Sequence, residues 1–340
     1  MNRFARGIAG LLTAAGLCLL SAGGALGGLS ARLAERPQEE RMRNVRLLRA
    51  SAPAASRAVR TVRENPPAAM TPEPTREPIE DFTVSAPDTV LETTIEGGMR
   101  IKNETSYWVD AAQILSEGPG LTLPADEPQI LIIHTHASEA YTQAGLDRYS
   151  ASDDSRTEDT QFNVVRIGDE LTALLTECGL NVIHDRGIYD YPSYTGSYNR
   201  AAAAIGQYLQ SCPGIRIVLD IHRDALGANG VVYKTMAEEE GTVASQIMLL
   251  VGTDESGLSH PYWRGNLALA LYLQNAVNSA FPTLMRPVDL VPQRYNQELT
   301  PGSLILEVGS SGNTLREALA AIRLFGRAAG PALAELVETP

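Results

Sequence analysis

Lysine is almost absent from this chain of 340 residues. Only Lys102 and Lys234 are lysines, so arginine carries nearly all of the positive charge. Acidic residues outnumber basic ones by 40 to 28, which gives a formal net charge of −12. A general nucleic-acid-binding protein needs a basic surface, so this balance argues against that class.

Cysteine is also scarce, and its spacing excludes two kinds of chemistry. Cys18 lies in an apolar N-terminal segment, whereas Cys178 and Cys212 lie in the globular part. Without a C-x-x-C pair, a thiolate zinc site or thioredoxin-type chemistry is not expected. We expect Cys178 and Cys212 to be buried free thiols, with a disulfide between them as the less favoured alternative.

A serine-hydrolase motif is missing as well. No G-x-S-x-G nucleophile elbow occurs, and the run Gly309-Ser310-Ser311-Gly312 has the wrong spacing for one. A metal-free serine hydrolase is therefore the least favoured of the enzyme classes considered.

The N-terminal region predicts an exported protein. After a short basic tip at residues 1–6, residues 7–29 contain a 22-residue run without charge, which is about the length that spans a hydrocarbon core. We favour a retained membrane anchor, and a cleaved signal peptide is the alternative. The basic tip places the rest of the chain outside, although the nine arginines in residues 30–63 oppose this orientation.

Residues 30–92 read as a linker. The segment is rich in Ala, Arg and Pro, and residues 65–78 contain five prolines without an apolar period, which is typical of an extended tether. Residues 93–340 then form the predicted catalytic domain.

Strand and helix patterns alternate through most of that domain. Strands are expected at 129–133, 180–183, 215–221, 231–235, 246–251 and 303–308. Helices are expected at 163–178, 198–211, 265–281 and 314–337, the last with a break at Gly330-Pro331. This alternation predicts an α/β fold with a mostly parallel sheet and helices on both faces. In such folds the ligand site lies beyond the carboxyl ends of the strands.

Three predicted strands end in a residue with metal-binding or acid–base chemistry. The strand 129–133 ends at His134 and His136, in the run ILIIHTHASEAY (130–141). The strand 215–221 ends at His222, in VLDIHRDA, and the strand 303–306 ends at Glu307, in LILEVGS. Parallel strands with right-handed crossovers bring these ends to one edge of the sheet. The alternative for each is a solvated or structural residue, but three such coincidences use three of the five histidines of the chain.

The chemistry of this set predicts a zinc site. His136, His222 and Glu139 form a plausible His₂Glu ligand set with an open position for water, and His134 is the alternative first ligand. The spacing does not separate the two histidines, because both would face the same side of one strand. Zn²⁺ lowers the pKa of bound water, and Glu307 would be the general base.

Weaker candidates surround this set. Arg223 would steady the oxyanion, and Asp220 or Asp224 would orient a histidine. Each of these is as readily explained by a plain salt bridge. His184 and His260 are expected to be solvated.

Five ordered motifs carry a resemblance to a known family. They are HTHASEAY (134–141), YDYPSYTGSYNRA (189–201), LDIHRDA (219–225), VGTD (251–254) and YNQELTPGSLILEVGSSGNTLREA (295–318). Together they resemble stage II sporulation protein P, a family of cell-wall hydrolases of endospore-forming bacteria, over roughly residues 95–325.

The resemblance implies a fold similar to the zinc-dependent N-acetylmuramoyl-L-alanine amidases and the matching activity, with endopeptidase action on cross-links. It implies action in the septal space during engulfment, together with stage II sporulation proteins D and M. The family's histidine ligands carry over to the HTH segment and His222, and its catalytic glutamate to Glu307. Glu158 or Glu170 are the alternatives to Glu139 as the third ligand.

The rival hypothesis is a non-catalytic peptidoglycan-binding scaffold on the same fold. Tyrosines of the run 189–198 can stack on sugars. The substrate-binding candidates are Tyr194 and Tyr198 from this run and Asn199, which follows it.

Overall fold

The computed structural model describes residues 89–93, 100–142, 155–228 and 231–339. The predicted tip, anchor and nearly all of the predicted linker lie outside these residues. Within them, no helix has both the length and the apolar character that crossing a membrane requires.

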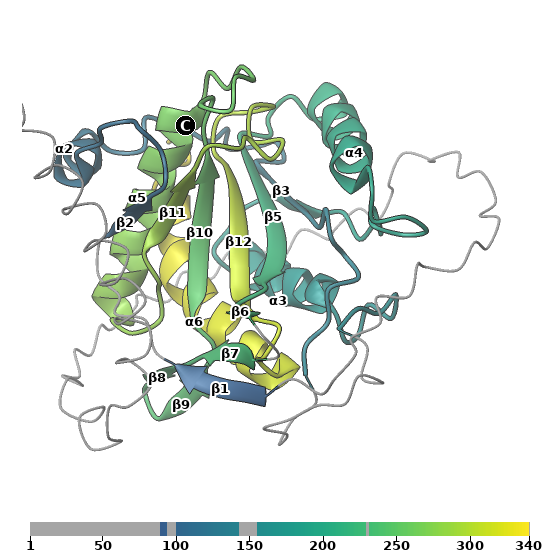
Figure 1. The fold of residues 1–340 in the computed structure, drawn as a ribbon. Coiled ribbons are helices and arrows are strands. Elements are labelled where there is room, and N and C mark those ends of the chain that lie inside the picture. The colour runs from purple at the N-terminus through teal and green to yellow at the C-terminus, as the bar shows by residue number, and fades with distance from the viewer. Residues whose placement is uncertain (1–88, 94–99, 143–154, 229–230, 340) are drawn as a thin grey trace, which may run out of the picture. The chain divides into compact units, whose positions relative to one another are not determined.

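A seven-stranded sheet forms the centre of the described domain (Figure 1). Every neighbouring pair of its strands is parallel except β10–β12, which is antiparallel. The predicted mostly parallel α/β sheet is therefore confirmed. In spatial order the strands are β2 (Ile101–Asn103), β11 (Val288–Val291), β10 (Ile247–Gly252), β12 (Ser303–Ser310), β5 (Ile217–Asp224), β3 (Ile130–Ile133) and β4 (Val182–His184).

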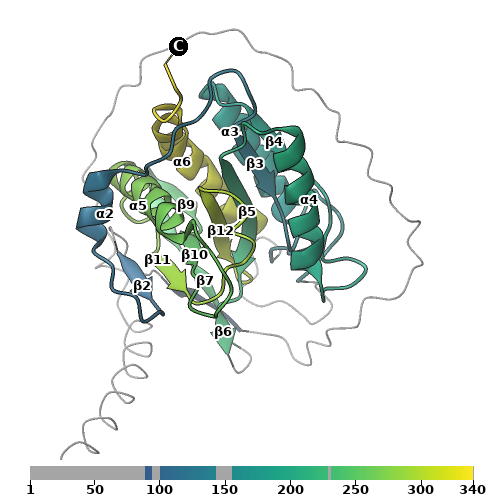
Figure 2. The ribbon, with the colours of Figure 1, turned by 90° about the horizontal axis from the view of Figure 1, so that it is seen from above.

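Helices cover both faces of this sheet, but unequally (Figure 2). α3 (Val164–Glu177), α5 (Trp263–Ala280) and α6 (Leu315–Ala334) pack on one face and share the larger apolar core with the sheet. α4 (Ser197–Ser211) packs on the other face, over the smaller cluster of Leu131, Ile133 and Val218. A further short helix, α2 (Ala111–Glu117), packs against α5.

The helix ends follow local capping chemistry. The side chain of Asn163 accepts a hydrogen bond from the Val165 amide at the start of α3. Thr314 and Glu317 form a reciprocal capping box at the start of α6. Gly179, with φ +86°, directly follows the residue that caps the end of α3, as glycine does where a left-handed residue is needed.

Two sequence predictions about helix ends were wrong. The helix expected at 198–211 was predicted to have Ser197 as its cap, because serine is a favoured residue there. Ser197 is instead the first residue of α4, and Gly196 occupies the cap position in a left-handed conformation. α6 is not broken at Gly330-Pro331 but continues to Ala334. Pro331 lies in the last turns, and its neighbours Gly330 and Ala332 are buried, so packing outweighs the one backbone hydrogen bond that proline removes.

Two small additional sheets are built from short strands that the sequence did not reveal, apart from the strand at 231–235, which was predicted. β1 (Thr89–Thr93) pairs with β7 (Val231–Thr235), which also pairs with β6 (Gly227–Ala228), and β8 (Ala237–Glu239) pairs with β9 (Thr242–Ala244). Residues 89–92, predicted as linker, therefore belong to β1. Cys178 and Cys212 are free thiols, as expected, but they are half-buried and not fully buried.

Candidate active site

The three strands predicted to share an edge do share it. β12, β5 and β3 are neighbours in the sheet and run parallel, so their carboxyl ends lie together. β5 and β12 continue beyond their predicted ends, however, to Asp224 and Ser310. His222 and Glu307 are therefore register partners on the sheet face near its edge, and do not follow the strands.

Alternation along β5 separates the core from the site. Leu219 and Ile221 belong to the core that α3, α5 and α6 cover. Since successive strand residues point to opposite faces, Asp220 and His222 project from the face that carries α4. The same alternation on β12 places Glu307 on that face, between the core residues Leu306 and Val308.

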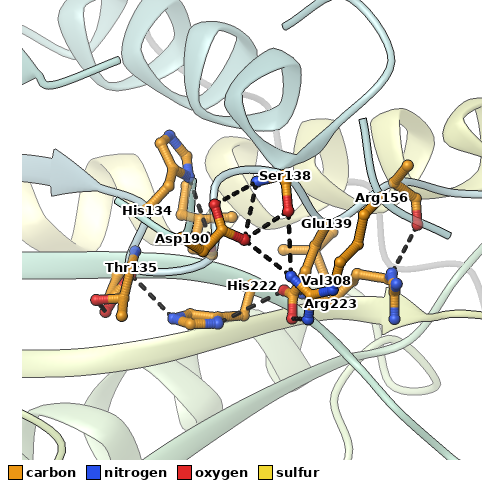
Figure 3. Close-up of polar contacts among 12 residues, drawn as sticks. His134, Thr135, Ser138, Glu139, Arg156, Asp190, His222, Arg223 and Val308 are labelled. Carbon is orange, nitrogen blue, oxygen red and sulfur yellow. Dashed lines mark hydrogen bonds and ion pairs between the residues drawn. The ribbon is translucent and has the colours of Figure 1, made fainter. Parts of the chain in front are cut away.

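The side chains of His134 and His136 point in different directions beyond the end of β3. The interpretation that both face one side was wrong, because β3 ends at Ile133 and the alternation of a strand no longer applies. The His136 ring lies 5.3 Å from the His222 ring, nearly perpendicular to it. His134 points away from His222 (Figure 3) and lies with its Nε2 2.8 Å from the Nε2 of His184. The structure thus brings His136 to the site and leaves His134 behind it.

Asp220 fastens the His134–Tyr141 segment to β5. Its carboxylate accepts hydrogen bonds from the amide and the hydroxyl of Thr135, at 2.8 and 2.6 Å. Its Oδ1 also lies 3.0 Å from His222 Nε2, an ion-pair contact whose angle is not that of a hydrogen bond. Asp220 therefore orients both histidine-bearing elements, the role that was predicted for it.

Glu139 lies at the other nitrogen of the same imidazole. Its Oε2 is 3.5 Å from His222 Nδ1 and accepts a hydrogen bond from the Arg223 amide at 3.1 Å. The alternative glutamates lie elsewhere. Glu158 is exposed, and Glu170 pairs with Arg323 on the helix side of the molecule.

A polar network absent from the sequence predictions supports Glu139 (Figure 3). Arg156 lies 3.5 Å from Glu139 and donates a 2.8 Å hydrogen bond to the buried carboxylate of Asp190. The same carboxylate accepts hydrogen bonds from the amide and the hydroxyl of Ser138. Asp190 lies within the YDYPSY motif, but no spacing rule joins it to Ser138 or Arg156.

The charges of these groups are strongly coupled. Burial disfavours the charged form of His222, yet Asp220 and Glu139 outweigh it and raise the pKa of His222 well above its ordinary value. Burial likewise opposes ionisation of Glu139, but His222 outweighs it and lowers the pKa of Glu139 to about 2. Burial and then His222 lower the pKa of His136 to about 4. The metal-free site therefore holds an imidazolium between two carboxylates, beside a neutral His136.

The pKa of Glu307 is shifted in the opposite direction to that of Glu139. Burial, only partly offset by His222, raises the pKa of Glu307 to about 8. Its Oε2 is buried and has no hydrogen-bond partner among the residues that the structure describes. A carboxyl group in this environment exchanges a proton near neutral pH, which is what a general acid or base needs.

Arg223 is not placed as an oxyanion donor. Its side chain leaves β5 on the face opposite to His222, where Nε donates to the Ala140 carbonyl at 2.6 Å and Nη2 donates to the Ser155 carbonyl at 2.7 Å. Asp224 pairs with Arg286 at 2.6 Å, so it orients no histidine through that contact. Arg223 thus holds the backbone at Ala140 and Ser155 in place, and Asp224 forms an ion pair with Arg286.

The predicted substrate-binding tyrosines contact His136. Tyr194 stacks on the His136 ring at 4.4 Å, and Tyr198 meets it edge-on at 5.3 Å. Arg156 also lies 4.8 Å above the Tyr194 ring. These contacts position the imidazole, and Tyr194 remains 44% exposed. Asn199 is exposed on α4 beside them.

The expectation that His184 and His260 are solvated was wrong for both. His184 is packed between His134 and Asp169, with its Nδ1 3.2 Å from the Asp169 carboxylate. His260 is 1% exposed, in the loop that precedes α5. Neither side chain contacts the candidate site.

The donors at the site fit a zinc ion by type. His136 Nδ1 is buried without a hydrogen-bond partner in the described part of the chain, and a second imidazole and a carboxylate lie beside it. This is a His₂Glu set, as catalytic zinc sites use. In the arrangement described here, no three His, Cys, Asp or Glu side chains among the described residues already converge as a metal site. A metal ion would have to replace the proton on His222 and separate it from Glu139.

Comparison with known proteins establishes the family. A family model described as stage II sporulation protein P matches residues 58–329, most of the chain. The chain therefore belongs to the stage II sporulation protein P family. Stage II sporulation protein P of Bacillus subtilis (strain 168) is 23% identical over 246 residues, which cover 68% of this chain. The match spans only 57% of that relative's length.

Solved structures with a similar arrangement include cell-wall amidases. An N-acetylmuramoyl-L-alanine amidase of Nostoc punctiforme is 14% identical, with 61% of this chain and 96% of that chain covered and a TM-score of 0.37. The corresponding amidase of Mycobacterium smegmatis is 15% identical, with 62% and 97% covered and a TM-score of 0.37. Identities and TM-scores of this size are too low to establish a shared activity.

Proposed function

We propose that this protein is a peptidoglycan hydrolase that cleaves the amide between N-acetylmuramic acid and L-alanine, with zinc as cofactor. The observation that carries the proposal is the cluster of His136, His222 and Glu139 beside the buried Glu307. Membership of the stage II sporulation protein P family supports a role in sporulation. Cleavage of peptide cross-links at the same site is a further part of the proposal.

The ligands in this proposal are His136, His222 and Glu139. When bound there, zinc polarises the amide carbonyl and lowers the pKa of a bound water. Asp220 keeps His222 in place from its far side, and Tyr194 and Tyr198 hold the His136 ring. His134 has no part in binding, because His184 and the Ile221 carbonyl already occupy its ring nitrogens.

Glu307 moves the proton in the proposed reaction. The oxygen of a water molecule bonds to the amide carbon, and the carbon–nitrogen bond breaks. Glu307 accepts a proton from that water and delivers it to the leaving nitrogen, so that a carboxyl group and an amine are released. The carboxylate form is required, and a positive charge nearby favours that form against the burial that now raises its pKa.

We also propose that the protein acts outside the cytoplasm, anchored to the cell membrane by residues 7–29, in the septal space of the sporulating cell. Stage II sporulation proteins D and M are its proposed partners. The family resemblance supports both statements, and the apolar N-terminal run supports the anchor.

A zinc titration combined with digestion of purified sacculi tests this proposal. Wild-type protein is expected to bind one zinc ion, to release protons as it does so, and to release free stem peptides. His222→Ala is expected to lose zinc and product together. Zinc-free protein that binds sacculi without releasing product would instead favour the non-catalytic scaffold.

A further inference from the structure

The loop between β11 and β12, residues 292–302, reaches the candidate site from a distant part of the chain. Asn296 Nδ2 donates a 2.8 Å hydrogen bond to the Tyr198 carbonyl. The ring of Tyr295 lies 5.5 Å from the ring of Tyr198, which itself contacts His136. Tyr295 therefore extends the row of rings that begins at His136.

The backbone at this point is strained. Tyr295 and Asn296 have φ values of 50° and 61°, and they are two of only three non-glycine residues with positive φ in the described chain. Such conformations are unfavourable for residues with a Cβ atom and persist where the surroundings hold them. Here the buried Gln297 does so, since its side chain accepts a 2.6 Å hydrogen bond from the Gly252 amide and its carbonyl accepts one from Asn266.

The Tyr295 hydroxyl is available as a donor. The residue is half-buried, and its hydroxyl makes no hydrogen bond to any part of the chain that the structure describes. Burial and then the charge of Glu307 raise the pKa of Tyr295, so the group keeps its proton in the neutral range. The ring position places Tyr295 next to Tyr198, in the row of rings that leads to His136.

The proposed hydrolysis needs such a donor. As water bonds to the amide carbon, the carbonyl oxygen gains negative charge, and donors aimed at that oxygen lower the barrier. Arg223 was predicted for this task, but its guanidinium donates to Ala140 and Ser155 instead.

We propose that the Tyr295 hydroxyl donates a hydrogen bond to the carbonyl oxygen of the scissile amide as that oxygen becomes charged. This role rests on the proposed amidase function. Tyr295 keeps its proton throughout, because the proton of the attacking water passes through Glu307 to the leaving nitrogen. The strained turn serves to hold the hydroxyl in place before the substrate binds.

The test is Tyr295→Phe in the full chain, loaded with zinc and assayed on a soluble N-acetylmuramoyl peptide. The variant keeps the ring and loses only the hydroxyl. We expect kcat to fall by about 10²- to 10³-fold, as for other lost oxyanion donors, with KM changed by less than about twofold. Zinc content and the denaturation midpoint are expected to stay as in wild type. Tyr262→Phe, at an exposed tyrosine before α5, is the matched control and should keep the wild-type kcat.

The outcomes separate the two proposals. Active wild type with a Tyr295→Phe kcat within about twofold of it would overturn the role of Tyr295 and leave the amidase function standing. A fall in kcat accompanied by loss of zinc or of folded protein would also overturn it, because the residue would then be structural. Wild type that binds zinc but cleaves no amide would overturn the proposed function, and the role of Tyr295 with it.

Discussion

The two faces of the central sheet come from the same strands and differ in what they carry. The face under α3, α5 and α6 is apolar along β5 up to Arg223, with Leu219, Ile221 and Leu306 in one core. The opposite face carries Asp220, His222 and Glu307 at neighbouring positions of the same two strands. A single alternation therefore separates the residues that stabilise the domain from those that we propose act on substrate.

The polar face of the sheet is stabilised by ion pairs between its buried charges. Buried charges cost free energy unless they are paired, and His222 is paired on both sides, by Asp220 and by Glu139. Glu307 lacks such a partner, and burial keeps it protonated near neutral pH. The site is thus held by an ion-pair network at one end and leaves one reactive carboxyl group unpaired.

The largest expected effect is a loss of activity without a loss of stability, and it follows from a substitution of Glu307. Glu307→Gln should lower kcat for stem-peptide release by about 10²- to 10⁴-fold, the range for a lost general base. The free energy of unfolding of the metal-free protein at pH 7 should hardly change, because glutamine resembles the protonated carboxyl that burial favours. Sacculus digestion and urea denaturation measure the two quantities. A variant with wild-type activity would remove Glu307 from the mechanism.

A substitution on the apolar face should have the reverse effect, a loss of stability without a loss of activity. Leu219→Ala, three residues before His222, removes a side chain that is 1% exposed in the main core. We expect a loss of about 2–5 kcal/mol in the free energy of unfolding, since a buried cavity is left behind. The kcat of the protein that remains folded should stay within about twofold of wild type. A large loss of kcat at unchanged stability would contradict the division between the faces.

A smaller effect concerns His134, which lies behind the site. Burial, followed by the neighbouring His184, lowers the pKa of His134 from 6.5 to about 3. The unfolded chain binds the proton near pH 6.5, so the stability contributed by neutral His134 is present above that pH and is lost as the pH falls towards 3.

His134→Asn should therefore be less stable than wild type at pH 7, and the stability of its metal-free form should fall less between pH 7 and pH 5. Urea denaturation at the two pH values measures this. Equal slopes for the two proteins would show that His134 does not carry the predicted pKa.

Much of the site could be predicted because it depends on strand order. The apolar runs before His134, His222 and Glu307 indicated three strands, and right-handed parallel connections place their ends together. The longer helices could also be predicted, because their apolar residues recur at helical spacing. Short strands such as β11 (VDLV) and the β8–β9 hairpin (AEE and TVA) were missed, because they lack the unbroken apolar run that marks β3.

The sequence did not predict the path of the chain outside the helices and strands. His134 and His136 diverge because β3 ends at Ile133, and a strand end is not visible to that accuracy. Arg156, Asp190 and Tyr295 reach the site from three separate loops, and their convergence depends on tertiary packing alone.

The measurement that tests the account most directly compares zinc binding and stem-peptide release for His136→Ala and His134→Ala, two substitutions only two positions apart. The account predicts that His136→Ala loses both the zinc and the product. His134→Ala should retain both in its folded fraction, despite its lower stability. Retention of zinc and product by His136→Ala, with their loss in His134→Ala, would contradict the assignment of the site.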